Sequence, residues 1–488
     1  MKKQLLLGLV LLFGLQLSAQ ENIFLERDFW NSKPTIKSID LKIKEGNDIT
    51  AKTSNNFDAV VYAILQENDN AIIKYVQSIE GNDINKLTHD GRTYMFWAAY
   101  KGNTEIMNYL ISKGANTKIT DDKGSTILNF AAASGQQNTK VYDICLANGA
   151  DLTKDLTPNG ANALLLSSQN DPEFKLLDYF SSKGLAINSI DAHGNDAFNY
   201  VAKTGDVDHL KKLHQKGIKG TDNAFVFATQ AGRRAKAKPL SFYKFLESLD
   251  LNPNVIDSEG KTPLLNLATY EENKEVFNYF IAKGVDVNTA DENGNTAFLN
   301  AVGRNKLDVI AYLLPMLNDV NHVNKKGESA LAMAVAYNSP EVVSYLLKNK
   351  AAISSVDNDG NTLAYYLLKS YEKPDFEEKL NVLKAEGFDV TKTQENGNTL
   401  FHIALEYDDL ALLKRVNEYG VDVNAKNKEG IAPLHLAAMK ANDDEVLKYL
   451  LSIGAKKTAV TGFEESAYDL ASENELLQEN NISIEFLK

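Results

Sequence analysis

Cysteine, arginine and long apolar runs are all scarce in this chain of 488 residues. The single cysteine, Cys145, excludes a disulfide framework and any metal site built from cysteines alone. Only 6 of the 52 basic residues are arginine, and the formal charge of −13 argues against binding a phosphate backbone, which needs a basic face. No stretch reaches the roughly 18 apolar residues of a membrane-spanning helix. An apolar fraction of 44% nevertheless excludes wholesale disorder.

The N-terminus has the pattern of a secretory signal peptide. Lys2 and Lys3 form a positive start, and residues 5–17 are an apolar run broken only by two glycines and a glutamine. Small residues follow, which places cleavage after Ala19 and removes residues 1–19. No cysteine follows that site, so a lipid anchor is not indicated. A buried N-terminal helix is the alternative interpretation.

A glycine preceded by a polar, often acidic, residue recurs along the rest of the chain. These glycines are Gly91, Gly124, Gly160, Gly194, Gly260, Gly294, Gly327, Gly360, Gly397 and Gly430. Their spacings are 33, 36, 34, 66, 34, 33, 33, 37 and 33 residues, and the 66 is two periods with one glycine missing. Length alone would suggest about three ordinary domains, but a fixed period of this size predicts one repeat array instead.

Each period contains the signals of two short helices. Two residues after the glycine stands a residue type that caps helix N-termini: Thr93, Thr126, Asn162, Asp196, Thr262, Thr296, Ser329, Thr362 and Thr399. Proline follows that position at Pro263 and Pro433, where a missing N–H costs nothing. A second apolar stripe ends at another glycine, as at Gly114, Gly149, Gly284, Gly420 and Gly454, which predicts helix termination in the left-handed conformation.

The unit resembles the ankyrin repeat, whose period is about 33 residues with a T-P-L-H-x-A core. Residues 399–404 (TLFHIA) and 432–437 (APLHLA) match that core best, and the resemblance covers residues 56–488. It implies an all-α solenoid of about 12–13 helix–turn–helix units with short β-hairpin fingers, capped at both ends. It also implies that His402 and His435, at the histidine position of the repeat, tie neighbouring turns together.

The expected organisation is a signal peptide, an N-terminal cap over residues 20–55, a first arm over 56–256 and a second arm over 257–488. The boundary rests on an irregular unit at residues 221–256, which lacks the acidic turn and carries an insertion between its helices. One smooth curve is the alternative to two arms. Within the insertion, four basic residues are candidates for contact with an anion, although most charge runs are only solvated faces: Arg233, Arg234, Lys236 and Lys238.

Catalytic and metal-binding patterns are not found in the sequence. His209 and His214 are five residues apart, a poor ligand spacing on a helix, and no zinc, phosphate-loop or nucleophile-turn motif appears. Cys145 lies in an apolar helical stripe, so a buried inert thiol is expected. The segment starting at Asp357 is similar to a calcium loop, but its twelfth position is Leu368 where a glutamate is needed. We therefore expect no enzyme activity, no cofactor and no metal.

The resemblance implies a recognition face formed by the finger tips and first helices. One position on that face lies eight residues after the helix cap and is not dictated by core packing. It holds Lys101, Tyr270, Arg304, Tyr337, Tyr407 and Lys440. Tyrosine and arginine are enriched at interface hot spots, so these six residues are the candidate partner-binding set. The alternative is that each tyrosine only packs on the next repeat.

The function expected from these observations is a non-catalytic scaffold that is exported from a bacterial cell to the periplasm or beyond. It would bind a protein partner on the concave face, as a monomer, without nucleic acid and without a membrane span after signal cleavage. An effector or inhibitor that blocks its partner fits the same sequence. An enzyme with a site in the irregular central unit is the least favoured alternative.

Overall fold

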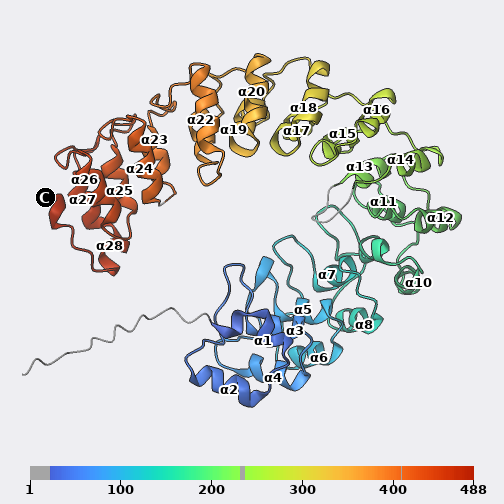
Figure 1. Ribbon diagram of the computed structural model, residues 1–488. Coiled ribbons are helices and arrows are strands. Elements are labelled where there is room, and N and C mark those ends of the chain that lie inside the picture. The colour runs from blue at the N-terminus through green and yellow to red at the C-terminus, as the bar shows by residue number, and fades with distance from the viewer. Residues whose placement is uncertain (1–21, 231–236, 408) are drawn as a thin grey trace, which may run out of the picture. The chain divides into compact units, whose positions relative to one another are not determined.

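The computed structural model describes residues 22–230, 237–407 and 409–488, and it confirms an all-α repeat architecture (Figure 1). The chain divides into two compact units, residues 1–220 and 221–488, each described here by itself. The expected signal peptide, together with Arg233, Arg234 and Lys236, lies outside the described residues.

The first unit opens with the cap expected from the sequence and continues through five repeats of paired helices. The cap contains η1 (Ile23–Leu25), α1 (Arg27–Asn31) and α2 (Ile36–Lys44). The repeats contain α3 (Ala59–Leu65), α4 (Asn70–Ser78), η2 (His89–Gly91), α5 (Tyr94–Tyr100), α6 (Thr104–Ser112), α7 (Ile127–Ala133), α8 (Thr139–Ala147), α9 (Ala163–Ser167), η3 (Ser168–Asn170), α10 (Lys175–Ser182), α11 (Ala197–Ala202) and α12 (Val207–Gln215).

The second unit repeats the same helix pair from the irregular repeat to the C-terminus. Its helices are α13 (Ala224–Thr229), α14 (Leu240–Glu247), α15 (Pro263–Leu267), α16 (Lys274–Ala282), α17 (Ala297–Arg304), α18 (Leu307–Leu313), η4 (Leu314–Met316), α19 (Ala330–Tyr337), α20 (Pro340–Lys348), α21 (Leu363–Leu368), α22 (Phe376–Ala385), α23 (Leu400–Ala404), α24 (Leu410–Glu418), α25 (Pro433–Lys440), α26 (Glu445–Ser452), α27 (Ala467–Glu473), α28 (Glu475–Glu479) and η5 (Glu485–Leu487). The array closes with the short helix α28, which contains Leu476 and Leu477.

Within each unit the helices form two layers. First helices pack on first helices of the next repeat, as α5 does on α7 and α17 does on α19, and second helices pack likewise, as α20 does on α22. The core lies between the layers and is lined by fully buried side chains such as Phe96, Phe198, Phe277 and Leu346. Because one helix pair cannot bury both of its faces, neighbouring repeats supply each other's core.

The local signals read from the sequence work as expected at most helix ends. Thr126 accepts a hydrogen bond from the main-chain N–H of Asn129 at 3.2 Å and so satisfies a free donor at the start of α7. Gly114 follows α6 with φ +88°, a conformation that costs a residue with a Cβ more than it costs glycine.

The fingers are held by side-chain and main-chain hydrogen bonds. Asp291 Oδ1 accepts from the N–H groups of Asn293 and Asn295, both at 2.9 Å, which closes one turn. Neighbouring fingers are then joined by main-chain rungs, with Lys325 N–H donating to the Asn293 carbonyl at 2.8 Å and Asn358 N–H to the Lys326 carbonyl at 2.9 Å. Four isolated antiparallel bridges, including Val323 with Ser329, are the β-structure among the described residues.

The irregular repeat groups with the second unit. Its α13 packs on α15 and its α14 packs on α16, so its helices share their core with the repeat that follows. The two compact units consequently divide at Gly220 and Thr221, whereas the sequence places the arm boundary at residues 256 and 257.

Candidate functional site

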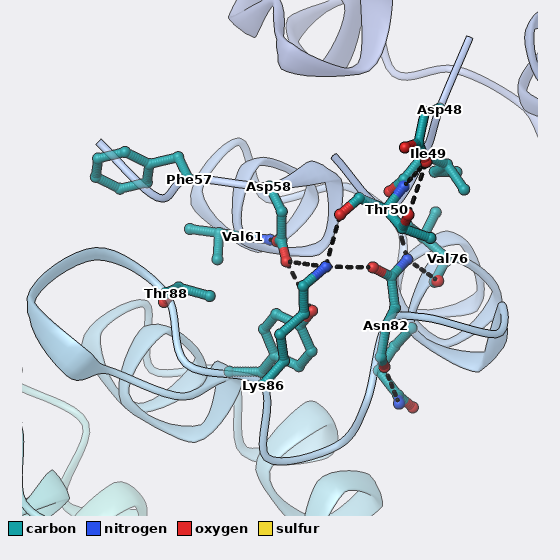
Figure 2. Close-up of polar contacts among 12 residues, drawn as sticks. Asp48, Ile49, Thr50, Phe57, Asp58, Val61, Val76, Asn82, Lys86 and Thr88 are labelled. Carbon is teal, nitrogen blue, oxygen red and sulfur yellow. Dashed lines mark hydrogen bonds and ion pairs between the residues drawn. The ribbon is translucent and has the colours of Figure 1, made fainter. Parts of the chain in front are cut away.

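A partly buried lysine in the first unit, Lys86, stands at the centre of the polar cluster shown in Figure 2. Lys86 Nζ lies 2.8 Å from the Thr50 carbonyl, 3.1 Å from Asn82 Oδ1 and 3.2 Å from Asp58 Oδ2. Tyr94 donates its hydroxyl to the same carboxylate oxygen at 2.8 Å. The side chain of Asp58 is fully buried, and that of Lys86 is 14% exposed.

This cluster is saturated. A lysine ammonium has three N–H donors, and three acceptors surround Lys86, so no donor is left for a ligand. The other oxygen of Asp58 caps α3 by accepting from Val61 N–H at 3.0 Å. The network therefore fastens the finger that follows α4 to the repeat before it, and a buried carboxylate of this kind needs its partner ammonium.

A second buried ion pair of the first unit has the same character. Arg92 Nε and Nη2 lie 3.0 and 2.9 Å from Asp121 Oδ2, and its guanidinium carbon lies 4.3 Å from the centre of the Phe130 ring. Asp121 also closes its own finger by accepting from the N–H groups of Lys123 and Ser125. Arg92 thus joins two consecutive repeats. The carboxylate of Asp121 compensates its charge, and the Phe130 ring lies against its guanidinium group.

The two histidines of the repeat position tie neighbouring turns together, as the resemblance implies. His402 Nδ1 accepts from Thr399 N–H at 3.1 Å, and its Nε2 bonds the Ile431 carbonyl of the next repeat at 3.0 Å. His435 makes the same two bonds, to Ala432 N–H and to the Ala459 carbonyl. Over the described ranges, no group of three or more histidine, cysteine, aspartate or glutamate residues is arranged to hold a metal ion.

Other candidate residues from the sequence occupy structural positions. Cys145 is buried, and that burial raises the pKa of its thiol to about 12, so it is no nucleophile at neutral pH. Asp357 closes a finger turn through the N–H groups of Asp359 and Asn361 and accepts the Tyr366 hydroxyl at 2.6 Å. Its carboxylate is therefore committed to the turn. Lys238 is buried, and its contact with an anion stays a prediction.

Three of the six predicted partner-binding residues are fastened to the preceding repeat. Lys101 forms an ion pair with Glu67, and Lys440 forms one with Glu406. Tyr270 is half-buried and donates its hydroxyl to the Thr229 carbonyl at 2.8 Å. These contacts are the packing role weighed as the alternative, although a partner could still reach the exposed parts of the lysines.

The other three residues lie at the ends of first helices of the second unit. Arg304 ends α17, Tyr337 ends α19 and Tyr407 comes three residues after α23. Arg304 is exposed and Tyr337 is 48% exposed. Tyr407 is half-buried and packs edge-on against Tyr371, with ring centres 5.2 Å apart. Their partner-binding role stays a prediction, but two of them border a larger cluster.

We call this cluster the tyrosine–lysine patch, and it consists of Tyr337, Tyr365, Lys369, Tyr371 and Tyr407. Lys369 Nζ lies 4.5 Å from the centre of the Tyr365 ring, within the range of a cation–π contact. Burial alone would lower the pKa of Lys369, but the hydroxyls of Tyr337 and Tyr365 raise it above its ordinary value. The lysine therefore stays charged inside an aromatic surface that is half-exposed.

Sequence reasoning missed three members of the patch. Tyr365, Lys369 and Tyr371 stand three, seven and nine residues after the helix cap Thr362, so they lie outside the compared position, which is Ser370 in this repeat. Residues 369–375 form the connection between α21 and α22, which is longer than the two residues between α19 and α20. The spacing of 37 residues between Gly360 and Gly397 is the signal of that insertion. If the extra residues of this repeat are placed between its two helices, Lys369 and Tyr371 become candidates for an exposed surface.

Stacked helix–turn–helix units joined by hairpin fingers define a helical-repeat protein, in which each unit contacts only its neighbours. The chain belongs to the ankyrin-repeat family. The family model described as "Ankyrin repeats (3 copies)" matches residues 59–152, 228–322, 300–375 and 367–461. This assignment confirms the resemblance drawn from the repeat core.

Curated relatives share the repeats at low identity. The chain is 29% identical over 144 residues to a probable palmitoyltransferase AKR2 of Saccharomyces uvarum, covering 29% of this chain and 17% of that protein. It is 25% identical over 242 residues to the phosphocholine transferase AnkX of Legionella pneumophila, covering 49% and 23%. The human transient receptor potential channel subfamily A member 1 is 23% identical over 87% of this chain and 36% of its own length. The chain thus spans less than a quarter of the two transferases it resembles.

A solved structure of the human ASB11 ankyrin repeat domain matches with a TM-score of 0.37 and 22% identity, covering 45% of this chain and 97% of that one. No helix in residues 22–230, 237–407 and 409–488 combines the length and apolarity needed to cross a membrane.

Proposed function

We propose that this chain is a non-catalytic scaffold that binds a protein partner through the tyrosine–lysine patch of its second unit. The observation that carries the proposal is the gathering of four tyrosines around a charged lysine on the first helices α19, α21 and α23 and the connections that follow them. Ankyrin repeats generally act in protein–protein interaction, and the transferases among the relatives match over only 17% and 23% of their own lengths.

The patch has the character of a binding surface rather than of a core. Tyr337 leaves 48% of its surface exposed. Tyrosine offers a large, rigid contact area with a polar tip, and interface hot spots are enriched in it. Tyr270 gives the contrast, because its hydroxyl is already committed to the Thr229 carbonyl.

The proposal includes export from a bacterial cell. The positive start, the apolar run over residues 5–17 and the small residues before Gln20 support it, as do a lone cysteine and an acidic surface. Cell fractionation followed by N-terminal sequencing tests it. We expect the mature protein outside the cytoplasm with Gln20 first, and a cytoplasmic protein that retains residues 1–19 would contradict export.

Site-specific photo-crosslinking tests the binding surface. A photoreactive phenylalanine analogue in place of Tyr337 should crosslink a partner in cells of the native source, whereas the same analogue at Lys348 should not. Lys348 is an exposed residue in the second-helix layer, at the end of α20, and serves as the matched control. The triple variant Tyr337→Ala, Tyr371→Ala, Tyr407→Ala should keep its circular dichroism spectrum and lose capture of the crosslinked partner. Equal crosslinking from both positions would sink the proposal.

A further inference from the structure

A pocket of about 530 Å³, lined mainly by apolar side chains, opens near the C-terminal end of the second unit. It shares no lining residue with the tyrosine–lysine patch, although Leu405 and Glu406 of its wall directly precede Tyr407 of the patch. Its lining comes from three successive repeats. Leu405 and Leu413 belong to the first, Ala437 and Met439 to the second and Leu476 to the third. This volume exceeds that of any single side chain, so the pocket can accept one large apolar group.

On one side of the pocket, between the repeats of α23 and α25, a tie seen in other repeats is not formed, whereas on the other side Asn474 makes it to the Ala438 and Ala441 carbonyls. In other repeats an asparagine between the two helices donates to carbonyls at the end of the preceding first helix. Asn338 Nδ2, for example, lies 2.7 Å from the Val302 carbonyl and 2.9 Å from the Asn305 carbonyl. Two residues separate α19 from α20, but four separate α25 from α26, and Asn442 in that connection is exposed. The longer connection leaves the space open.

Apolar side chains that other repeats bury are uncovered around this space. The residue just before the innermost residue of the second helix is Val276, Val309, Val342 or Leu412 in four repeats, and each is at most 2% exposed. The equivalent Leu476 is 48% exposed, and Met439 on the opposite wall is 39% exposed. These walls would gain stability by covering one another or by taking up an apolar ligand.

The surroundings of the pocket are acidic. Glu406 and Asp443 line the pocket itself, and Asp444, in the α25–α26 connection with Asp443, is paired with Lys448. The two short helices that supply Leu476 and its neighbours also carry Glu473, Glu475 and Glu479. Lys440 is the one basic side chain that lines the pocket, and it is already paired with Glu406. An occupant with its own positive charge is therefore favoured over a neutral or acidic one.

We infer that this pocket binds a basic peptide segment of a partner protein, seating one bulky apolar side chain between Met439 and Leu476 while lysine or arginine residues beside it contact the carboxylates. The pocket and the tyrosine–lysine patch have no residue in common, so substitutions at Met439 or Leu476 test the pocket while Tyr337 tests the patch.

A randomised peptide library displayed on phage, selected against the whole mature chain, tests the inference. We expect enriched sequences that combine one large apolar residue with neighbouring lysine or arginine. A fluorescein-labelled copy of an enriched peptide, titrated by fluorescence polarisation, should bind at least ten-fold more weakly to Leu476→Glu and to Met439→Glu. Ten-fold corresponds to about 1.4 kcal/mol. Glu473→Gln with Glu475→Gln should also weaken binding and reduce its salt dependence.

Phe463→Ser is the matched control, because Phe463 is 85% exposed at a finger tip and does not line the pocket. It should leave the affinity unchanged, while Tyr337→Ala separates this site from the patch. The inference is overturned if no peptide is enriched, if enriched peptides lack basic residues, or if the pocket variants bind as well as the wild type. Circular dichroism confirms folding of each variant, and both pocket substitutions lie at exposed positions.

Discussion

Single buried side chains fasten one repeat to the next, and His402 shows how protonation enters that fastening. Its Nδ1 accepts a hydrogen bond from Thr399 N–H, so Nε2 must carry the proton that bonds the Ile431 carbonyl. A second proton on the ring would remove the acceptor. Burial lowers the pKa of His402 below its ordinary value of 6.5, which keeps the ring neutral in the folded state.

The stability of the second unit should therefore fall as the pH drops below 6.5. Above that value histidine is neutral in both states, and below it the unfolded chain binds a proton that folded His402 resists binding. Urea unfolding at a pH above 6.5 and at one well below it measures the effect. His402→Gln should unfold with a smaller pH dependence than the wild type, and an identical dependence in the two proteins would contradict the assignment.

A second residue of this kind is Lys379 in α22, whose side chain is fully buried while its Nζ has no hydrogen-bond partner. Asp375 Oδ2 lies 3.6 Å away, and burial lowers the pKa of Lys379 despite that carboxylate. Equivalent positions hold Val342 and Leu412. The double variant Lys379→Met, Asp375→Asn should therefore raise the free energy of unfolding by about 1–4 kcal/mol, whereas Asp375→Asn alone should lower it. Urea titration of both variants and the wild type measures these changes in the free energy of unfolding. A double variant less stable than the wild type would contradict this account.

At the scale of elements, the finger glycine Gly327 leaves no room for a side chain. A Cβ at Gly327 (φ +79°) would lie 2.6 Å from the N atom of Asn358, the donor of the rung to the next finger. A Cβ at Gly420 (φ +75°) would meet nothing within 4 Å. Both glycines share the left-handed conformation, but only the first lies against a neighbouring backbone.

Gly327→Ala should consequently destabilise the second unit more than Gly420→Ala does. Each variant bears the left-handed strain of about 1–2 kcal/mol, and Gly327→Ala also loses a rung worth about 1 kcal/mol. Chemical denaturation of the two variants beside the wild type provides the comparison. Equal losses of stability would show that the rung contributes nothing.

Element-level prediction from the sequence succeeds where a position recurs and fails where the connection changes length. Thr126 and Gly114 were identified because every repeat needs a cap and a stop at those places. The role of Lys369 was missed because it lies one residue before the compared repeat position, and that of Lys379 because the longer connection before α22 shifts it out of the repeat register. A lysine near the start of a helix is also expected to point into solvent, and only the fold shows that Lys379 faces the core.

At the scale of the whole molecule, the two compact units should lose structure separately. Leu434 is 2% exposed in α25, and Leu434→Ala should cost about 2–5 kcal/mol. Because stability in a repeat array is a sum of nearest-neighbour terms, the loss should spread from the C-terminal repeats. Limited proteolysis should then release peptides from residues 221–488 while residues before Gly220 stay protected. A single all-or-none digestion would count against this.

The fold class and the caps followed from the glycine period, but the division of the chain did not. The irregular insertion suggested a boundary at residues 256 and 257. The packing of α13 on α15 instead joins that repeat to its successor, because helices pair through their apolar faces whether or not the finger before them is regular. Surface properties such as the pocket beside Met439 depend on loop paths that no repeat position encodes.

The rungs between fingers are made by main-chain atoms alone. The donors include Glu292, Lys325 and Asn358, which share no side-chain chemistry. Proline is the residue that such a joint cannot accept as its donor, since it has no N–H. Mutation can therefore rewrite the finger tips almost without cost to the joint, and gene duplication can add or remove a repeat with its attachment already in place. An array built this way can acquire a new specificity faster than a fold whose surface and joints use the same side chains.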